Sequence, residues 1–247
     1  MHLRITLALA ALALSSAAFA QIDSSHPDAF QVRYVSNLNL GDSYINITNT
    51  GTDATFSGTH GSDKGICVNV YAFDPAEELI ACCSCAVTPN GLAKLSVTGD
   101  LISNTLTPAT PSSIVVKLLA TVLSVNAVEA ADDGQPKDAG QAVPCDPGSA
   151  YDQIARSNKG ANTGNLDPEE FLASGMRAWG TSLHKNTSTS PAGIAITEGA
   201  FVYGGLSEDE FLHITQFCGF IEGNATAPQN SGICNSCKTG GLFGARQ

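Results

Sequence analysis

Short runs in which apolar and polar residues alternate, separated by turn-forming residues, extend over residues 30–125. Residues 31–35 and 42–48 both alternate in this way. Alternation places successive side chains on opposite faces of a strand, so each run predicts a half-buried strand. Residues 114–122 form the most apolar run and predict a central strand. The pattern predicts a mainly β fold with at least six antiparallel strands, arranged as an Ig-like antiparallel β-sandwich over residues 21–125.

Residues 126–165 break this pattern. They are rich in Ala, Asp, Gly, Pro and Gln and contain few bulky apolar residues, which is typical of a linker or a long loop. Two alternatives remain open. The segment separates a domain at 21–125 from a smaller C-terminal region at 166–247, or it is a long insertion within one sandwich.

The C-terminal region at 166–247 combines helix and strand signals, which predicts an α+β region. Asp, Pro and Glu at 167–170 indicate the start of a short helix, with Gly175 expected at its end. Residues 176–184 and 194–203 predict two strands on either side of a polar loop.

A second helix is expected over residues 207–222. Ser207 and the three acidic residues that follow it form a capping box, and acidic side chains favour the first turn of a helix. Apolar residues then recur at helical spacing and predict one buried face: Phe211, Ile214, Cys218 and Ile221.

The first twenty residues have the pattern of a secretory signal peptide. Arg4 gives a positive start, residues 5–14 are apolar, and Ala-Phe-Ala at 18–20 forms a cleavage site before Gln21. The apolar run is shorter than the ~20 residues that a spanning helix needs. We therefore expect an exported protein, located extracellularly, at the cell surface or in the periplasm, with no transmembrane segment in the mature chain.

Charge narrows the classes of partner. The chain has 12 Lys and Arg against 23 Asp and Glu, a net charge of −11. Removal of residues 1–20 deletes Arg4 and leaves 11 basic against 23 acidic side chains. Because an anionic chain repels a phosphate backbone, we expect no nucleic-acid binding.

Eight cysteines remain after cleavage of the signal peptide, and in an exported protein an even number predicts disulfides. Four precede the 126–165 segment and four lie within or beyond it, which favours pairing inside each region. The disulfide candidates are Cys67, Cys82, Cys83, Cys85, Cys145, Cys218, Cys234 and Cys237.

Hairpin geometry narrows the pairing of the first four cysteines. Residues 67–85 predict two strands around a polar turn. A three-residue loop places Cys67 opposite Cys83, and a four-residue loop places Cys67 diagonal to Cys82. We expect Cys67 to pair with Cys82 or Cys83, Cys85 to take a remaining cysteine, and no thiol to be left.

Two other uses of the cysteines, a metal site and redox catalysis, compete with disulfides. Residues 82–85 and 234–237 both have C-x-x-C spacing, but they lie much farther apart than the ~15–20 residues of a zinc ribbon. Redox catalysis at Cys234 and Cys237 needs a helix after the motif, whereas Gly240 and Gly241 follow it. Disulfides therefore remain the favoured reading, and no metal is expected.

Signals for catalysis are few. The mature histidines His26, His60, His184 and His213 are scattered, and the sequence contains neither an H-E-x-x-H pair, a G-x-S-x-G elbow nor a P-loop. Residues 158–167 are rich in Asn, Gly and Asp, but their spacing does not match an EF-hand and favours a surface loop. No catalytic residue and no cofactor is expected.

Four segments carry a resemblance. Residues 41–51, with the sequence Asn-Ile-Thr-Asn-Thr-Gly at their end, resemble a strand and turn of secreted bacterial Ig-like domains. Residues 65–74 and 82–85, together with Cys-Gly-Phe-Ile at 218–221, resemble exported, cysteine-containing bacterial proteins. The resemblance implies the compartment and the fold class. It implies no activity, and no site residue can be carried over.

Export, disulfides and a β-sandwich without catalytic motifs favour a non-catalytic structural or adhesive protein. The first alternative is a ligand-binding module, for carbohydrate, that uses Tyr34, Tyr203 or Trp179. The second is a secreted enzyme built around His184 or His213 and nearby carboxylates.

For assembly, two alternatives remain open: a monomer with flexible ends, which the sequence favours, and self-association through edge strands. A sandwich leaves strand edges with unsatisfied donors and acceptors. The lysines before residue 126 that could protect such edges are few: Lys64, Lys94 and Lys117. Residues 21–30 and 240–247 are candidate donor strands for self-association.

Overall fold

The computed structural model describes residues 26–52, 65–103, 109–122, 172–186, 188, 193–224 and 234–236. Several expectations fall on other parts of the chain: the signal peptide at 1–20, the 126–165 segment, the helix start at 167–170, His60, Cys145 and Cys237. Within the described part, no helix is long and apolar enough to cross a membrane.

Strands account for most of the described chain, which confirms the mainly β fold and the six strands expected before residue 125. Between the strands lie the helix α2 (Glu208–Asn224) and two short helical turns, η1 (Leu38–Leu40) and η2 (Val97–Leu101). The strands are β1 (Phe30–Val35), β2 (Tyr44–Asn49), β3 (Ile66–Phe73), β4 (Leu79–Val87), β5 (Leu92–Ser96), β6 (Ile114–Val122), β7 (Met176–Asn186), β8 (Gly193–Ala200), β9 (Val202–Tyr203) and β10 (Cys234–Ser236).

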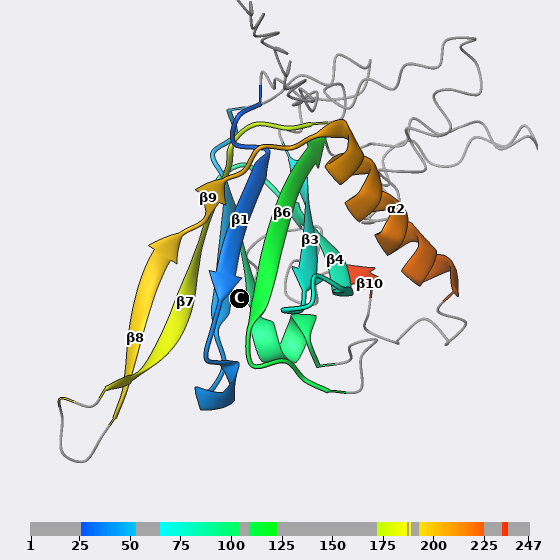
Figure 1. The fold of residues 1–247 in the computed structure, drawn as a ribbon. Helices are drawn as coiled ribbons and strands as arrows, with labels where there is room; N and C mark the ends of the chain where they lie inside the picture. Colours follow the sequence, from blue (N-terminus) through cyan, green and yellow to red (C-terminus); the bar gives the residue numbers. More distant parts are fainter. Residues whose placement is uncertain are drawn as a thin grey trace, which may run out of the picture.

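The described strands form two sheets (Figure 1). The six-stranded sheet has the order β10-β4-β3-β6-β1-β9, and the four-stranded sheet has the order β5-β2-β7-β8. Neighbours are antiparallel, except that β10 pairs parallel to β4 at one edge.

Strands from both sides of the 126–165 segment share each sheet. β7 pairs with β2 in the smaller sheet, and β9 pairs with β1 in the larger one. The chain passes from β8 to β9 through Phe201, whose N–H donates to the carbonyl of Ala178 at 2.9 Å. The expected boundary between 21–125 and 166–247 is therefore not a division between sheets, because strands of both regions pair within each.

A single apolar core joins the two sheets. Val68, Val70 and Leu118 of the larger sheet belong to the same buried cluster as Ile45 and Ile47 of β2. Each of these side chains is essentially removed from water, which stabilises the fold by about 1.5–3 kcal/mol per side chain.

α2 lies against the opposite face of the larger sheet (Figure 1). Its residues Phe211, Ile214 and Cys218 are fully buried, as the helical spacing predicted. Ser207 caps the helix, since its Oγ accepts a hydrogen bond from Glu210 N at 3.0 Å. Lys117 of β6 forms an ion pair with Glu210 on the first turn.

β3 and β4 show what this layering does to the pattern of burial. Every residue of β3 is buried. The smaller sheet and α2 lie on opposite faces of the larger sheet, and both contact the neighbouring strand β4. Strands covered on both faces lose the alternation of a half-exposed strand. Tyr71 and Asn69 are accordingly buried beside Val68 and Val70.

Candidate functional site

A disulfide between Cys82 and Cys218 fixes α2 to the larger sheet. Cys82 lies on β4 and Cys218 on the buried face of α2, with their Cα atoms 6.2 Å apart. The bond joins residues 136 positions apart in the sequence. Pairing inside each region is therefore wrong for these two cysteines.

The expected partners of Cys67 are also wrong. Cys82 is bonded to Cys218, and Cys67 stands opposite Ala86 rather than beside Cys82 or Cys83. The reason lies in the hairpin: Phe73 pairs with Leu79 across a five-residue turn, and a bulge adds one further residue of shift. Neither the three-residue nor the four-residue loop considered from sequence gives this register.

The other described cysteines differ in state. Cys67 and Cys85 are disulfide-bonded. Cys83 is a buried thiol, and burial together with the negative charge of Asp100 raises its pKa to about 12. The expectation that no thiol is left is therefore wrong. Cys234 begins β10, where its backbone pairs with that of Cys82.

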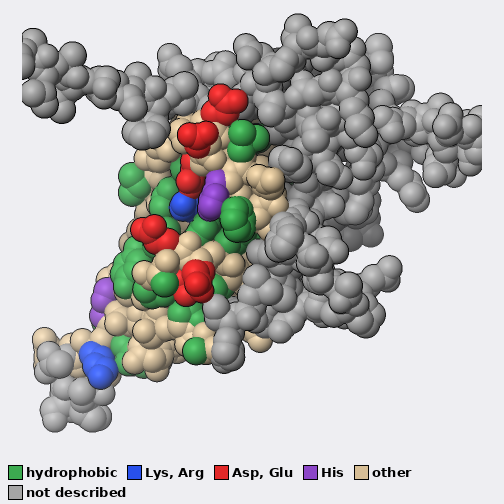
Figure 2. All heavy atoms as spheres, turned by 45° about the vertical axis from the view of Figure 1, so that its right-hand side comes forward, with side chains coloured by type: hydrophobic (Ala, Val, Ile, Leu, Met, Phe, Trp, Pro, Cys, Tyr) green, Lys and Arg blue, Asp and Glu red, His purple; other side chains and the backbone are tan. Residues whose placement is uncertain are grey.

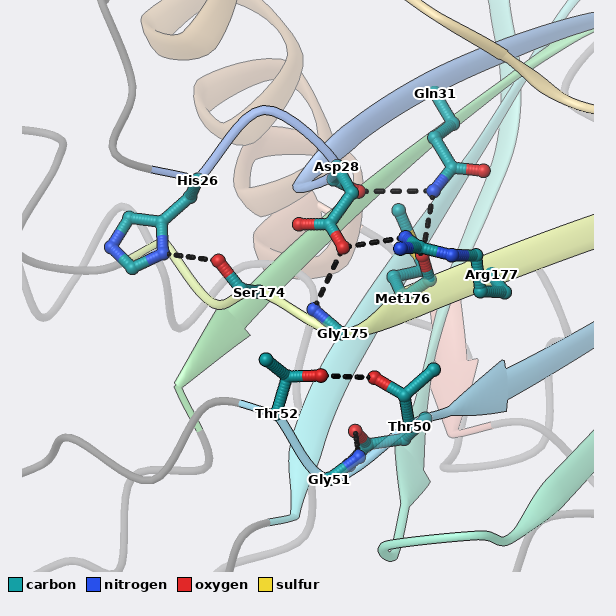
Figure 3. Close-up of polar contacts among 11 residues, drawn as sticks. His26, Asp28, Gln31, Thr50, Gly51, Thr52, Ser174, Gly175, Met176 and Arg177 are labelled. Atoms are coloured by element: carbon teal, nitrogen blue, oxygen red, sulfur yellow. Dashed lines mark hydrogen bonds and ion pairs between the residues drawn. The ribbon is translucent and has the colours of Figure 1, made fainter.

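A second cluster joins the starts of β1 and β7, and we call it the polar junction (Figure 3). Asp28 Oδ2 accepts hydrogen bonds from Arg177 Nη1 at 2.6 Å and from Gly175 N at 3.0 Å. Gln31 Nε2 donates to the carbonyls of Asp28 and Met176, both at 3.0 Å. These contacts tie one sheet to the other at their shared end.

Gly175 is required at the turn that enters β7. Its φ is +101°, in the left-handed region that favours glycine. A Cβ there would lie 2.9 Å from Thr50 Oγ1, and the Gly175 carbonyl accepts from Thr50 N at 2.8 Å. The sequence predicted that a short helix ends at Gly175. Residues 172–174 are not helical, and Leu172 instead forms a β-bridge with Thr121; the start of the expected helix lies outside the described residues.

His26 and Ser174 sit beside the polar junction, with His26 Nδ1 2.7 Å from Ser174 Oγ. A nucleophilic triad needs a carboxylate that orients the histidine. The bonded oxygen of Asp28 is instead engaged by Arg177 and Gly175, and its Oδ1 is buried without a hydrogen-bond partner in the described part of the chain. The geometry fits a structural contact between the two sheets rather than a catalytic site.

Asp28 and Phe30 are also committed to the fold, the first in the polar junction and the second in β1. The described part of the candidate donor segment 21–30 is therefore already engaged within its own chain. Residues 240–247, the other candidate donor, lie outside the described residues.

The two histidines considered for an enzyme lie on different elements. His184 Nε2 is 2.9 Å from Thr197 Oγ1 on the β7–β8 hairpin. The rings of His213 and Phe217 contact each other at a tilt on the exposed side of α2, with their centroids 4.4 Å apart. Around α2, Figure 2 shows acidic side chains interspersed with hydrophobic ones. Among the described residues, no three His, Cys, Asp or Glu side chains converge closely enough to hold a metal ion.

The three rings considered for ligand binding do not share a face. Tyr34 is exposed on the face of β1 that points away from the smaller sheet, whereas Tyr203 pairs with Gln31 on the other face. Trp179 is half-buried on the outer face of the smaller sheet, beside Asn46. The structure therefore places these rings on separate surfaces.

β8 is an exposed edge strand of the four-stranded sheet, and it is longer than the edge strand β9 of the larger sheet. Ile194 and Ile196 are 54% and 66% exposed, and every residue of β8 is exposed or partly exposed. Figure 1 shows that the β7–β8 hairpin extends beyond the body of the molecule. Sequence reasoning found the two strands, but it expected the open edges before residue 125.

Backbone geometry shows which β8 groups point outward. Phe201 N donates to the Ala178 carbonyl, and hydrogen-bonded and non-hydrogen-bonded pairs alternate along an antiparallel ladder. Gly193, Ala195, Thr197 and Gly199 therefore bond to β7. The N–H and C=O groups of Ile194, Ile196 and Glu198 face away from it.

Arg33 closes the far end of this edge. Its Nη1 donates to the Gly199 and Ala200 carbonyls at 2.7 and 3.2 Å, and its Nη2 donates to Ser182 Oγ at 3.1 Å. The open part of the edge consequently ends at Glu198.

Comparison with known proteins gave no relative. No protein-family model matches the chain, and no curated protein and no solved structure is significantly similar to it.

Proposed function

We propose that the protein is exported and serves outside the cytoplasm as a non-catalytic structural or adhesive protein with an Ig-like β-sandwich. The shared core between the two sheets supports the sandwich, and the Cys82–Cys218 disulfide is compatible with an oxidising compartment.

The observation that carries the proposal is the open edge of β8. Natural sheet proteins usually protect their edges with charged residues, proline, a bulge or a covering segment. β8 instead presents Ile194 and Ile196 beside outward-facing backbone groups. An unprotected apolar edge on a rigid, disulfide-fixed body is suited to contact with another protein surface.

Export is tested by expressing the full chain in a bacterial host and measuring the intact mass of the product in each cell fraction. The mature protein should begin at Gln21 and lie outside the cytoplasm. A product that retains residues 1–20 and stays in the cytoplasm would refute export.

Adhesion is tested with Ile194→Ser/Ile196→Ser, compared with Leu92→Ser as the control. Leu92 is 50% exposed on the opposite edge of the same sheet. The double variant should move from the envelope or matrix fraction into the free fluid, while the control should not. Equal partitioning of all three proteins would contradict an adhesive role for β8.

A further inference from the structure

The open edge of β8 is complementary to the same edge of a second copy of the chain that runs in the antiparallel direction. We infer that a second copy of this chain docks on it, so that two β8 strands pair antiparallel about a two-fold axis and join the two smaller sheets. This inference rests on the proposed function, because it names the partner of the same edge.

The outward backbone groups fix the register. Ile194, Ile196 and Glu198 each offer one N–H and one C=O, and none of these groups has a hydrogen-bond partner among the described residues. An antiparallel pair that uses all three sets Ile196 opposite the partner's Ile196 and Ile194 opposite the partner's Glu198. Arg33 closes the edge beyond Glu198, so a longer register is blocked.

Charge complementarity supports a second copy as the occupant. Lys185 of β7 pairs with Ile194, so the two side chains share the outer face of the sheet. In the proposed register, the partner's Glu198 lies on the other side of Ile194, about 10 Å from Lys185 between Cα atoms. Extended Lys and Glu side chains span that distance. The two-fold axis creates this contact twice, with the pair of Ile196 residues between them.

The apolar contacts of the proposed dimer follow the same two-fold symmetry. Ile194 and Ile196 are exposed in the single chain and would become cross-strand neighbours of the partner's residues. β8 and α2 lie on opposite sides of the molecule, so the helix does not cover this edge (Figure 1).

The experiment is sedimentation of the purified mature protein over a range of concentrations, with four charge variants. Lys185→Glu and Glu198→Lys each set like charges across both symmetric contacts and should weaken dimer formation about tenfold. The combined Lys185→Glu/Glu198→Lys variant restores opposite charges and should return the affinity to within about threefold of the wild type. Lys94→Glu, on the far edge of the same sheet, makes the same change of charge and should leave the dimer unchanged.

A backbone variant tests the pairing separately from charge. Ile196→Pro removes an outward N–H while leaving the β7 ladder its donors, so it should abolish the dimer. Circular dichroism and thermal melting confirm that each variant is folded. A wild-type protein that stays monomeric at high concentration, or single charge reversals that the double variant does not rescue, would overturn the inference. Because sedimentation uses purified protein, such a failure is distinct from a failure of export or of surface retention.

Discussion

The β3–β4 hairpin and the β7–β8 hairpin have the same local design and opposite surroundings. β3 and β4 lie between the smaller sheet and α2, so their polar residues are buried along with the apolar ones. β8 forms the edge of its sheet, and its isoleucines face solvent. The comparison teaches that the same strand chemistry gives a structural core in one place and an interaction surface in the other, according to what covers it.

The difference extends to how polar groups are satisfied. Asn69 Nδ2 donates to the Leu119 carbonyl and to Thr121 Oγ1, and Ser84 Oγ donates to Asn69 Oδ1. Buried polar groups on the covered side thus bond to one another, as the cost of leaving them unsatisfied requires. The outward N–H and C=O groups of β8 are instead available for hydrogen bonds to water or, in the proposed dimer, to the partner strand.

The largest expected loss of stability comes from removing the disulfide that fixes α2 to β4. Cys82→Ala/Cys218→Ala should lower the free energy of unfolding by about 3–5 kcal/mol, because the disulfide restricts the unfolded chain across a long loop. Chemical denaturation measures this value. Cys83→Ala, one residue along the same strand, controls for the loss of a buried sulfur, and a double variant no less stable than this control would contradict the role of the bond.

Two substitutions of phenylalanine on α2 compare a buried position with an exposed one. Phe211→Ala should cost about 3–5 kcal/mol of stability, since its fully buried ring leaves a cavity. Phe217→Ala, where the ring is 47% exposed on the same helix, should cost under about 1 kcal/mol. Equal losses in urea denaturation would show that α2 does not cover the sheet as described.

The reactivity of the Cys83 thiol shows directly whether β4 is shielded from solvent. Its pKa of about 12 reflects burial and the charge of Asp100, so the thiol stays protonated and unreactive at neutral pH in the folded protein. Because folding raises this pKa, the contribution of Cys83 to stability is present below its ordinary pKa and is lost as the pH rises towards 12. A maleimide should label Cys83 only after denaturation, and Cys83→Ala should remove that label. Rapid labelling of the native protein would show that β4 is open.

The smallest expected effect concerns Asp42, at the exposed end of the smaller sheet. Burial acts to raise its pKa, but hydrogen bonds from Ser96 Oγ at 2.6 Å and Thr98 N at 2.9 Å outweigh burial and lower it. The stabilisation is present above the ordinary pKa and is lost as the pH falls through the lowered value. Asp42→Asn should cost under about 1 kcal/mol at neutral pH, and the difference from the wild type should shrink in acid. A constant difference in thermal stability down to low pH would contradict this account.

Much of the local structure could be predicted from the sequence. Alternation predicted β1 and β2, a continuous apolar run predicted β6, and Ser207 with its acidic successors predicted α2, because these signals depend on neighbours along the chain. Even the two strands around residues 185–191 were found. Their place at the edge of a sheet was not, since it depends on pairing with β2.

The register of the β3–β4 hairpin could not be predicted for a similar reason. The bulge between Ala72 and Phe73 adds a residue that no turn signal announces. The five-residue turn together with this bulge separates Cys67 from Cys82, which instead bonds Cys218 of α2. The polar junction was missed as well, because Asp28 and Arg177 are brought together only by the contact between the sheets.

Residue-resolved amide hydrogen exchange tests the contrast between the two hairpins most directly. In dilute protein, the amides of Ile194, Ile196 and Glu198 should exchange quickly, while those of Ala195, Thr197 and Gly199 and of all β3 residues should be protected. At high concentration, the same three outward amides should become protected as β8 pairs with its partner. Protection of these three amides already in the dilute monomer, or fast exchange along β3, would contradict the account.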